Sequence, residues 1–173
     1  MNLKAAILTC SDRCSRGEAR DESGQALHAA MRARGAEVVA YEIVPDDIEP
    51  IAARLREMAE MGAQVILTTG GTGIAPTDVT PEATRQVIER EVPGIAEAMR
   101  AASIASTPHA MLSRAVAGIR GRTLIVNLPG SPRGASQCLE VVVSALDHAV
   151  ELLSGPVSDE SHHPPADWRG TQE

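Results

Sequence analysis

Aromatic side chains are almost absent from this chain of 173 residues, which contains one tyrosine, Tyr41, one tryptophan, Trp168, and no phenylalanine. Proteins that bind single-stranded nucleic acid without sequence preference need rings on which bases can stack, so this composition argues against that class. Basic charge is also scarce, because the formal net charge is −7. A general binder of phosphate backbones needs a basic surface, and we therefore expect no nucleic-acid partner.

Long apolar runs and paired cysteines are missing as well. No run approaches the roughly 20 apolar residues that a membrane helix needs, and the start Met1-Asn-Leu-Lys4 lacks a signal-peptide profile. Cys10, Cys14 and Cys138 are an odd number and do not have metal-ligand spacing. These features predict a cytoplasmic protein with reduced thiols and no membrane partner.

Small aliphatic side chains are what the sequence does contain, with 43% hydrophobic and 23% charged residues. This balance is that of a globular protein, and the length suits one domain with a substantial core. After Gly155-Pro156 the composition changes to Ser, Asp, His, Pro and Gly. We therefore expect a catalytic domain at residues 1–155 and a tail, outside the core and disordered, at residues 156–173.

Strand and helix patterns alternate along the first half of the chain. Short apolar or β-branched runs predict strands, and apolar residues at helical spacing between them predict helices. The expected strands are residues 4–10, 37–44 and 64–69, and the expected helices are residues 23–34 and 48–61. This order predicts an α/β fold made of βαβ units, with a parallel sheet covered on both faces.

The second half is expected to continue with helices near residues 81–90 and 93–105 and a long helix at about 133–153. Between them, residues 115–119 and 122–128 flank Arg120-Gly121 and predict a hairpin or a pair of short strands.

A glycine-rich segment follows the third predicted strand. Gly70, Gly71 and Gly73 are expected to adopt positive φ angles and to let the backbone approach a ligand. Thr80 before Pro81 predicts an N-cap and the first residue of a helix. Glycines, hydroxyls, a carboxylate and a helix start within so few residues indicate a binding site.

Polar residues follow each of the predicted strands. Because the carboxyl ends of parallel strands meet at one edge of a sheet, where ligands bind in open α/β folds, these segments are expected to converge. They are Thr9-Cys-Ser-Asp12, Val44-Pro-Asp-Asp47, Thr69-Gly-Gly-Thr-Gly73 and Asn127-Leu-Pro-Gly-Ser-Pro132.

Each of these residues also has a purely structural interpretation. Ser11 or Asp12 could cap a turn, and Asp47 is expected to cap the following helix, which leaves Asp46 without a structural role. Asp78 could stabilise its own loop through an Asx turn. The segment at 127–132 could simply be a sharp strand-to-helix turn, although its helix N-terminus suits a phosphate, and Ser113 could be a local turn former.

Two carboxylates from different strand ends, Asp46 and Asp78, together with glycine loops suit a nucleotide bound with Mg²⁺, which is commonly held by one or two carboxylates and phosphate oxygens. The P-loop pattern and the dinucleotide-binding glycine pattern are both absent. An ordinary nucleoside triphosphatase or a nicotinamide-dependent dehydrogenase is therefore not expected.

Over about residues 3–153, the chain closely resembles the molybdopterin adenylyltransferases of molybdenum cofactor biosynthesis, a family that includes the G domain of gephyrin. The matching segments include the four strand ends above, together with Pro76-Thr-Asp-Val-Thr-Pro-Glu-Ala83, Ile88-Glu-Arg-Glu-Val-Pro-Gly94, Ala110-Met-Leu-Ser-Arg114 and Ala117-Gly-Ile-Arg-Gly121.

The resemblance implies a three-layer α/β/α molybdopterin-binding fold with a mostly parallel central sheet, usually assembled as a homotrimer. It implies transfer of AMP from the co-substrate ATP to the terminal phosphate of molybdopterin, with Mg²⁺ and release of pyrophosphate. A molybdate-inserting enzyme is a possible partner. The alternative is a non-catalytic molybdopterin-binding or scaffold protein of the same fold.

The resemblance also implies roles for residues of this sequence. Asp46 and Asp78 would be catalytic and hold or orient Mg²⁺, and Ser113 would belong to the active site. The expected substrate- and nucleotide-binding residues are Ser11, Asp12, Gly70, Gly71, Thr72, Gly73, Asn127, Pro129, Gly130, Ser131 and Pro132.

Overall fold

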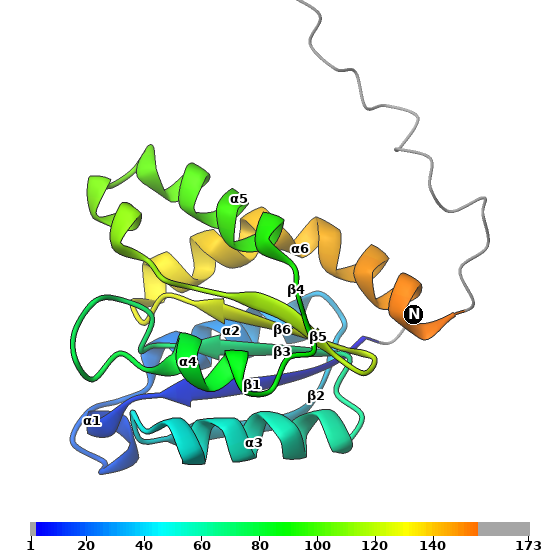
Figure 1. The fold of residues 1–173 in the computed structure, drawn as a ribbon, viewed down its shortest axis with the longest axis horizontal. Helices are drawn as coiled ribbons and strands as arrows, with labels where there is room; N and C mark the ends of the chain where they lie inside the picture. The colour runs from blue at the N-terminus through cyan, green and yellow to red at the C-terminus, as the bar shows by residue number, and fades with distance from the viewer. Residues whose placement is uncertain (1–2, 156–173) are drawn as a thin grey trace, which may run out of the picture.

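A central sheet organises the computed structural model, which describes residues 3–155 (Figure 1). Its strands are β1 (Lys4–Cys10), β2 (Glu37–Val44), β3 (Val65–Thr69), β4 (Arg90–Glu91), β5 (Ala117–Arg120) and β6 (Thr123–Leu128). They are arranged in the order β2-β1-β3-β6-β5-β4. The β2, β1, β3 and β6 strands are parallel to one another, whereas β5 pairs antiparallel with both β6 and β4. The predicted mostly parallel sheet and the hairpin around Gly121 are confirmed.

Helices cover both faces of the sheet and complete the three predicted layers (Figure 1). In chain order they are α1 (Asp12–Ser15), α2 (Glu22–Ala33), α3 (Ile48–Glu60), α4 (Thr80–Arg85), α5 (Pro93–Ile104), the 3₁₀ helix η1 (Pro108–Leu112) and α6 (Pro132–Ser154). Helices α2, α5 and α6 pack on one face, and α3 and α4 pack on the other. Within residues 3–155, no helix is both long and apolar enough to cross a membrane.

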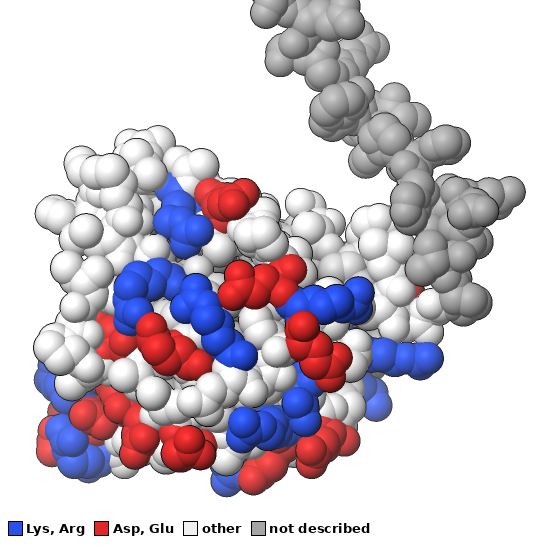
Figure 2. Space-filling view, in the orientation of Figure 1, with Lys and Arg blue, Asp and Glu red and all other residues white. Residues whose placement is uncertain are grey.

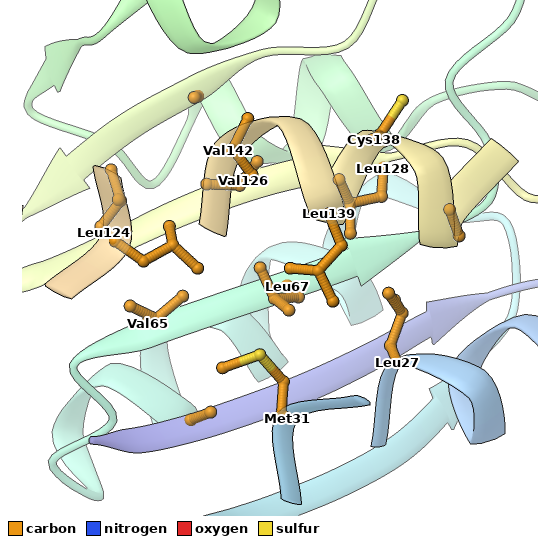
Figure 3. Close-up of a cluster of buried hydrophobic side chains, with 14 of the residues drawn as sticks. Leu27, Met31, Val65, Leu67, Leu124, Val126, Leu128, Cys138, Leu139 and Val142 are labelled. Carbon is orange, nitrogen blue, oxygen red and sulfur yellow. The ribbon is translucent and has the colours of Figure 1, made fainter. Parts of the chain in front are cut away.

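The core is built from aliphatic side chains that alternate between the two faces of each central strand. On β1, Ile7 packs toward α2 and α6, whereas Leu8 packs toward α3. This alternation follows from the pleat of a strand, and burial on both faces explains why the strands are apolar throughout. Figure 3 shows the α6 side of the core, where Leu139 lies toward Leu67 of β3 and Val142 lies beside Val126 of β6.

The α4 region differs from the sequence prediction. The helix expected near residues 81–90 ends at Arg85, and Arg90–Glu91 forms the edge strand β4, which pairs with β5. Ile88 explains the change, because its side chain lies against Gly118 of β5, where an added Cβ would be 2.5 Å from the Ile88 Cδ1 atom. The missing side chain of Gly118 therefore leaves the room that Ile88 occupies between the helix and β4.

The expected N-cap of α4 is also wrong. The cap position is Val79, which makes no side-chain cap hydrogen bond, and Thr80 is the first residue of the helix. The Thr80 hydroxyl is buried and donates to the carbonyl of Gly70 at 2.9 Å. This long-range bond fastens the glycine turn to α4. The tail predicted at residues 156–173 lies outside the described residues.

Candidate functional site

Two adjoining cavities lie where the β1, β2, β3 and β6 strands end. The first, of about 410 Å³, is called the Ser113 cavity after one of its lining residues. The second, of about 310 Å³, is called the Asp46 cavity. Gly71, Asp78 and Gly130 line both cavities. The predicted convergence of distant segments at one sheet edge is therefore present, and it takes the form of two connected hollows.

The glycine turn has the backbone that was expected at two of its three glycines. Gly70 and Gly71 have φ angles of +96° and +62°, whereas Gly73 does not have a positive φ. Gly73 is required for space instead, because a Cβ atom there would lie 2.8 Å from an Asp78 carboxylate oxygen. A Cβ at Gly130 would lie 3.1 Å from the Cα of Gly70, so the turns after β3 and β6 are in close contact.

Asp46 is bound on one side only. Its Oδ2 accepts a 2.9 Å hydrogen bond from the Asp12 amide, and Asp12 Oδ1 accepts one of 3.1 Å from the Asp46 amide. The other oxygen of Asp46, Oδ1, is buried and has no hydrogen-bond partner among residues 3–155. Burial raises the pKa of Asp46; the Asp12 amide opposes this, and the charges of Asp12 and Asp78 add to it.

Asp12 and Asp47 have structural roles after β1 and β2. The expected substrate contact of Asp12 is not supported by its position, because its carboxylate serves the Asp46 amide and it lines neither cavity. Asp47 caps α3 as predicted. Ser11 caps the short helix α1, accepting from the Cys14 amide at 3.3 Å, and it also lines the Asp46 cavity.

Asp78 combines the two roles that the sequence left open. Its Oδ2 accepts from the Ala75 amide at 2.8 Å, and its own amide donates to the Ala75 carbonyl at 2.9 Å, so the carboxylate closes its own turn. The residue nevertheless lines both cavities. The turn therefore fixes the carboxylate at the junction of the two hollows.

Ser113 lies in the wall of the larger hollow, directly after η1. Its Oγ accepts from the Ala115 amide at 3.4 Å, which leaves the hydroxyl proton to be donated into the cavity. The Arg100 guanidinium holds the backbone on both sides of this serine, donating to the carbonyls of Ser113 and Ala115 at 3.4 Å and 3.2 Å.

The turn between β6 and α6 divides into a buried part and an exposed part. Asn127 is completely buried: its Oδ1 accepts from the Val116 amide, and its Nδ2 donates to the hydroxyls of Thr68 and Thr84, each at 2.9 Å. The side-chain amide of Asn127 is therefore engaged beneath the rim, and the substrate contact expected of this residue stays a prediction.

The exposed part does line the cavities, with Pro129 and Ser131 facing the Ser113 cavity, Pro132 facing the Asp46 cavity and Gly130 facing both. Ser131 caps α6 through the Gly134 amide at 3.1 Å. Thr72 lines the Ser113 cavity and is almost fully buried. The strand-to-helix turn and the cavity wall are therefore the same segment.

Sequence reasoning missed several polar residues that line the cavities, among them Asp21, and it also missed Arg114, which lines neither cavity but binds a loop of the site. Asp21 lines the Asp46 cavity and accepts hydrogen bonds from Thr9 and Tyr41, both at 2.6 Å, and from the Gly24 amide at 2.8 Å. Its position before a predicted helix would have identified it as a cap. Arg114 binds the loop that carries Asp78, and no local pattern reveals such a contact.

A divalent cation fits the carboxylates that are present. Among residues 3–155 no group of three or more His, Cys, Asp or Glu side chains could hold a metal ion. Asp46 and Asp78 can supply two hard oxygen ligands, and Mg²⁺ is usually held by one or two carboxylates with substrate phosphates and waters. The unpartnered Oδ1 of Asp46 is the atom that a cation would satisfy.

The chain was compared with known proteins. A family model described as "Probable molybdopterin binding domain" matches residues 6–148. The chain is 41% identical over 156 residues to a molybdopterin adenylyltransferase of Helicobacter pylori, covering 88% of this chain and 89% of that protein. It is 43% identical over 169 residues to gephyrin of Dictyostelium discoideum, covering 90% of this chain but only 24% of gephyrin, so it spans about a quarter of that relative.

A solved structure has the same fold. The molybdopterin biosynthesis enzyme MoaB of Thermus thermophilus is 51% identical, with a TM-score of 0.84, and the match covers 89% of this chain and 98% of that chain. The family model covers most of the chain, and the relatives share well over 30% of its residues. The chain belongs to the molybdopterin-binding-domain family of molybdenum cofactor biosynthesis.

Proposed function

We propose that this protein is a molybdopterin adenylyltransferase, which transfers AMP from ATP to the terminal phosphate of molybdopterin and releases pyrophosphate. The observation that carries this proposal is the pair of adjoining cavities, with Asp78 lining both, Asp46 in one and Ser113 in the other. Two hollows that meet at a carboxylate suit two substrates that react where they meet. The name and the nearly full-length match of the Helicobacter relative support the same activity.

The proposed reaction is an in-line displacement at phosphorus. An oxygen of the terminal phosphate of molybdopterin attacks the α-phosphorus of ATP and forms the new P–O bond. The bond from that phosphorus to the bridging oxygen breaks, and its electron pair leaves with pyrophosphate. The protein contributes positioning of the two substrates and electrostatic stabilisation of the charge on the phosphate oxygens.

Particular residues are proposed for these tasks. Asp46 and Asp78 would hold Mg²⁺, which when bound supplies neutralisation of the phosphate oxygens. Ser113 would donate its free proton to a phosphate oxygen, since its lone pairs already accept from Ala115. The Arg133 amide at the N-terminus of α6 would donate to a phosphate oxygen, since Pro132 has no N–H and the Gly134 amide donates to Ser131. Gly71 and Gly130, which line both cavities, let the backbone approach the substrates closely.

Further features are proposed with the activity. We infer a cytoplasmic homotrimer that uses Mg²⁺ and passes its product to a molybdate-inserting enzyme. The resemblance to the adenylyltransferase family supports these four points. Sedimentation analysis of the purified protein would measure the oligomeric state, and a value other than a trimer would contradict that part alone.

The activity is tested by incubating the purified protein with molybdopterin, ATP and Mg²⁺. Formation of adenylyl-molybdopterin and pyrophosphate in equal amounts is expected, and omission of Mg²⁺ or addition of a chelator should abolish it. Binding of molybdopterin without product would instead support a scaffold protein of the same fold. Failure to bind the pterin would contradict both functions.

A further inference from the structure

Arg114 makes several long-range hydrogen bonds, which go to the segment that carries Asp78 and to the residues that flank it. Its Nε donates to the carbonyl of Gly73 at 2.6 Å, and its Nη2 donates to the carbonyl of Asp78 at 2.5 Å. Its backbone amide donates to the carbonyl of Thr72 at 2.8 Å. One residue therefore binds both ends of residues 73–78, which we call the Asp78 loop.

Glu82 of α4 completes this arrangement. Its carboxylate accepts from Nη1 and Nη2 of Arg114, so the guanidinium is held from the helix side as well. Although burial alone would raise the pKa of Glu82, the hydrogen bond from Arg114 lowers it. Basic and acidic side chains lie next to one another over α4 in Figure 2. The planar fork of an arginine suits this geometry, whereas a lysine ammonium is a point charge that cannot span the same acceptors.

We propose that Arg114 is the positioning residue of the site: it clamps the Asp78 loop to the segment that carries Ser113, so that the two side chains are held in a fixed relation. The proposal rests on the adenylyltransferase function inferred above, because it assigns Asp78 and Ser113 to one reaction. Arg114 is the chain neighbour of Ser113 and binds the backbone carbonyl of Asp78. It lines neither cavity, so it acts through these residues and does not touch the substrates.

The loop has little else to hold it. Inside it, the bonds between Asp78 and Ala75 close a local turn, and Ile74, Ala75, Pro76 and Thr77 are all exposed. A turn of this kind keeps its own shape but does not determine where it lies relative to the rest of the protein. The bonds from Arg114 supply that placement, because they join the loop to residues about 40 positions further along the chain.

The test compares Arg114→Lys with Arg85→Lys, a matched control in which the same change is made at another arginine on or beside α4. Arg85 pairs with Glu91 at 3.1 Å, is half exposed and lines neither cavity. Hydrogen–deuterium exchange of the substrate-free protein measures the amides of the Asp78 loop. We expect exchange about tenfold faster in Arg114→Lys, since charge-assisted bonds are lost, and unchanged exchange in Arg85→Lys. Glu82→Gln, which loosens the guanidinium but keeps one acceptor, should give a smaller change in the same direction.

Adenylyl transfer supplies the second readout. We expect kcat of Arg114→Lys to fall about tenfold or more while KM for ATP and molybdopterin changes much less, since binding contacts remain and alignment is lost. Loop exchange equal to that of Arg85→Lys would overturn the clamp. Faster exchange with an unchanged kcat would overturn the positioning role. A wild-type protein that exchanges as expected but forms no product would refute the proposed function and leave the clamp standing.

Discussion

Asp21 and Asp46 line the same cavity, yet the protein uses their carboxylates in opposite ways. Asp21, at the start of α2, accepts hydrogen bonds from the hydroxyls of Thr9, Ser23 and Tyr41 and from the amide of Gly24. Asp46, after β2, accepts one hydrogen bond at Oδ2 and leaves a buried Oδ1 without a partner among the described residues. Both carboxylate oxygens of Asp21 are thus bound within the protein, whereas Oδ1 of Asp46 is open to the cation proposed above.

The difference shows that hydrogen-bond satisfaction separates a structural carboxylate from a functional one better than location does. A buried polar atom without a partner costs free energy, so its persistence indicates a function. Burial also raises the pKa of Asp46, because water is excluded from the carboxylate and the single hydrogen bond from the Asp12 amide only partly offsets this.

The largest expected effect is on catalysis. Asp46→Asn and Asp78→Asn are each expected to lower kcat by roughly 100-fold or more, because a charged ligand for the phosphate-bound cation is lost. The free energy of unfolding should change by less than about 1 kcal/mol. Steady-state kinetics and urea denaturation measure the two quantities. Asp147→Asn, an exposed change on α6, is the matched control, and a mutant of Asp46 or Asp78 with full transfer activity would falsify the assignment.

Asp21→Asn should show the reverse pattern. The variant replaces a charged carboxylate that accepts hydrogen bonds from three hydroxyls. Hydrogen bonds to charged groups contribute about 1.5–3 kcal/mol, so a loss of about 2 kcal/mol in the free energy of unfolding is expected. The effect on kcat should stay below about tenfold, since the cavity keeps Asp46. If the Asp21→Asn protein were as stable as wild type but inactive, Asp21 would have to be counted among the functional residues of the site and not among the structural ones.

Tyr41→Phe tests the structural role of Asp21 with a smaller expected loss of stability. The change removes one of the two hydroxyl donors to Asp21 Oδ2 and keeps the ring that stacks on His28. A loss of about 1 kcal/mol in the free energy of unfolding is expected from one hydrogen bond. Thermal or urea unfolding measures it. If Tyr41→Phe costs as much as Asp21→Asn, the carboxylate contributes nothing beyond this single bond.

The smallest effect is a pH dependence of stability. The folded-state pKa of Asp46 is raised above its unfolded value of about 3.9. The contribution of this group to stability is therefore complete below that unfolded pKa and is lost as the pH rises through the raised, folded pKa. The stability of Asp46→Asn relative to wild type should therefore increase slightly as the pH is raised from acid to neutral. Melting curves at several pH values measure the difference, and a difference of opposite sign would contradict the raised pKa.

Much of the fold could be predicted because its causes are local. The alternation of apolar strands and amphipathic helices predicted the α/β layers, and β1 and β2 begin and end where expected. The end of α4 could not be predicted, because the chain beyond it pairs with β5 and Ile88 packs against Gly118, and no local pattern shows these contacts. Thr80 was misassigned for a similar reason: its hydroxyl finds the carbonyl of Gly70, ten residues earlier in the chain, instead of its own helix.

The location of the site could be predicted from the sequence, but the state of its individual side chains could not. Strand ends and glycines indicated the rim, and most of the expected residues line one of the two cavities. Asn127 and Asp12 line neither cavity, and their side chains are bound by groups distant in the sequence, which the residues themselves did not indicate. The sequence shows which polar groups are near the rim, but it does not show which of them are already satisfied.

By itself, the sequence determined the layers of this protein and the sheet edge at which polar residues gather, since periodicity, glycine conformations and strand ends are properties of short segments. Only the tertiary structure decided which polar groups remain free. Asp12 and Asp46 are 34 residues apart, and Asn127 reaches partners 43 and 59 residues away. Such bonds form when separate strands and helices pack together, so the unpartnered oxygen of Asp46 and the clamp of Arg114 exist only in the folded chain.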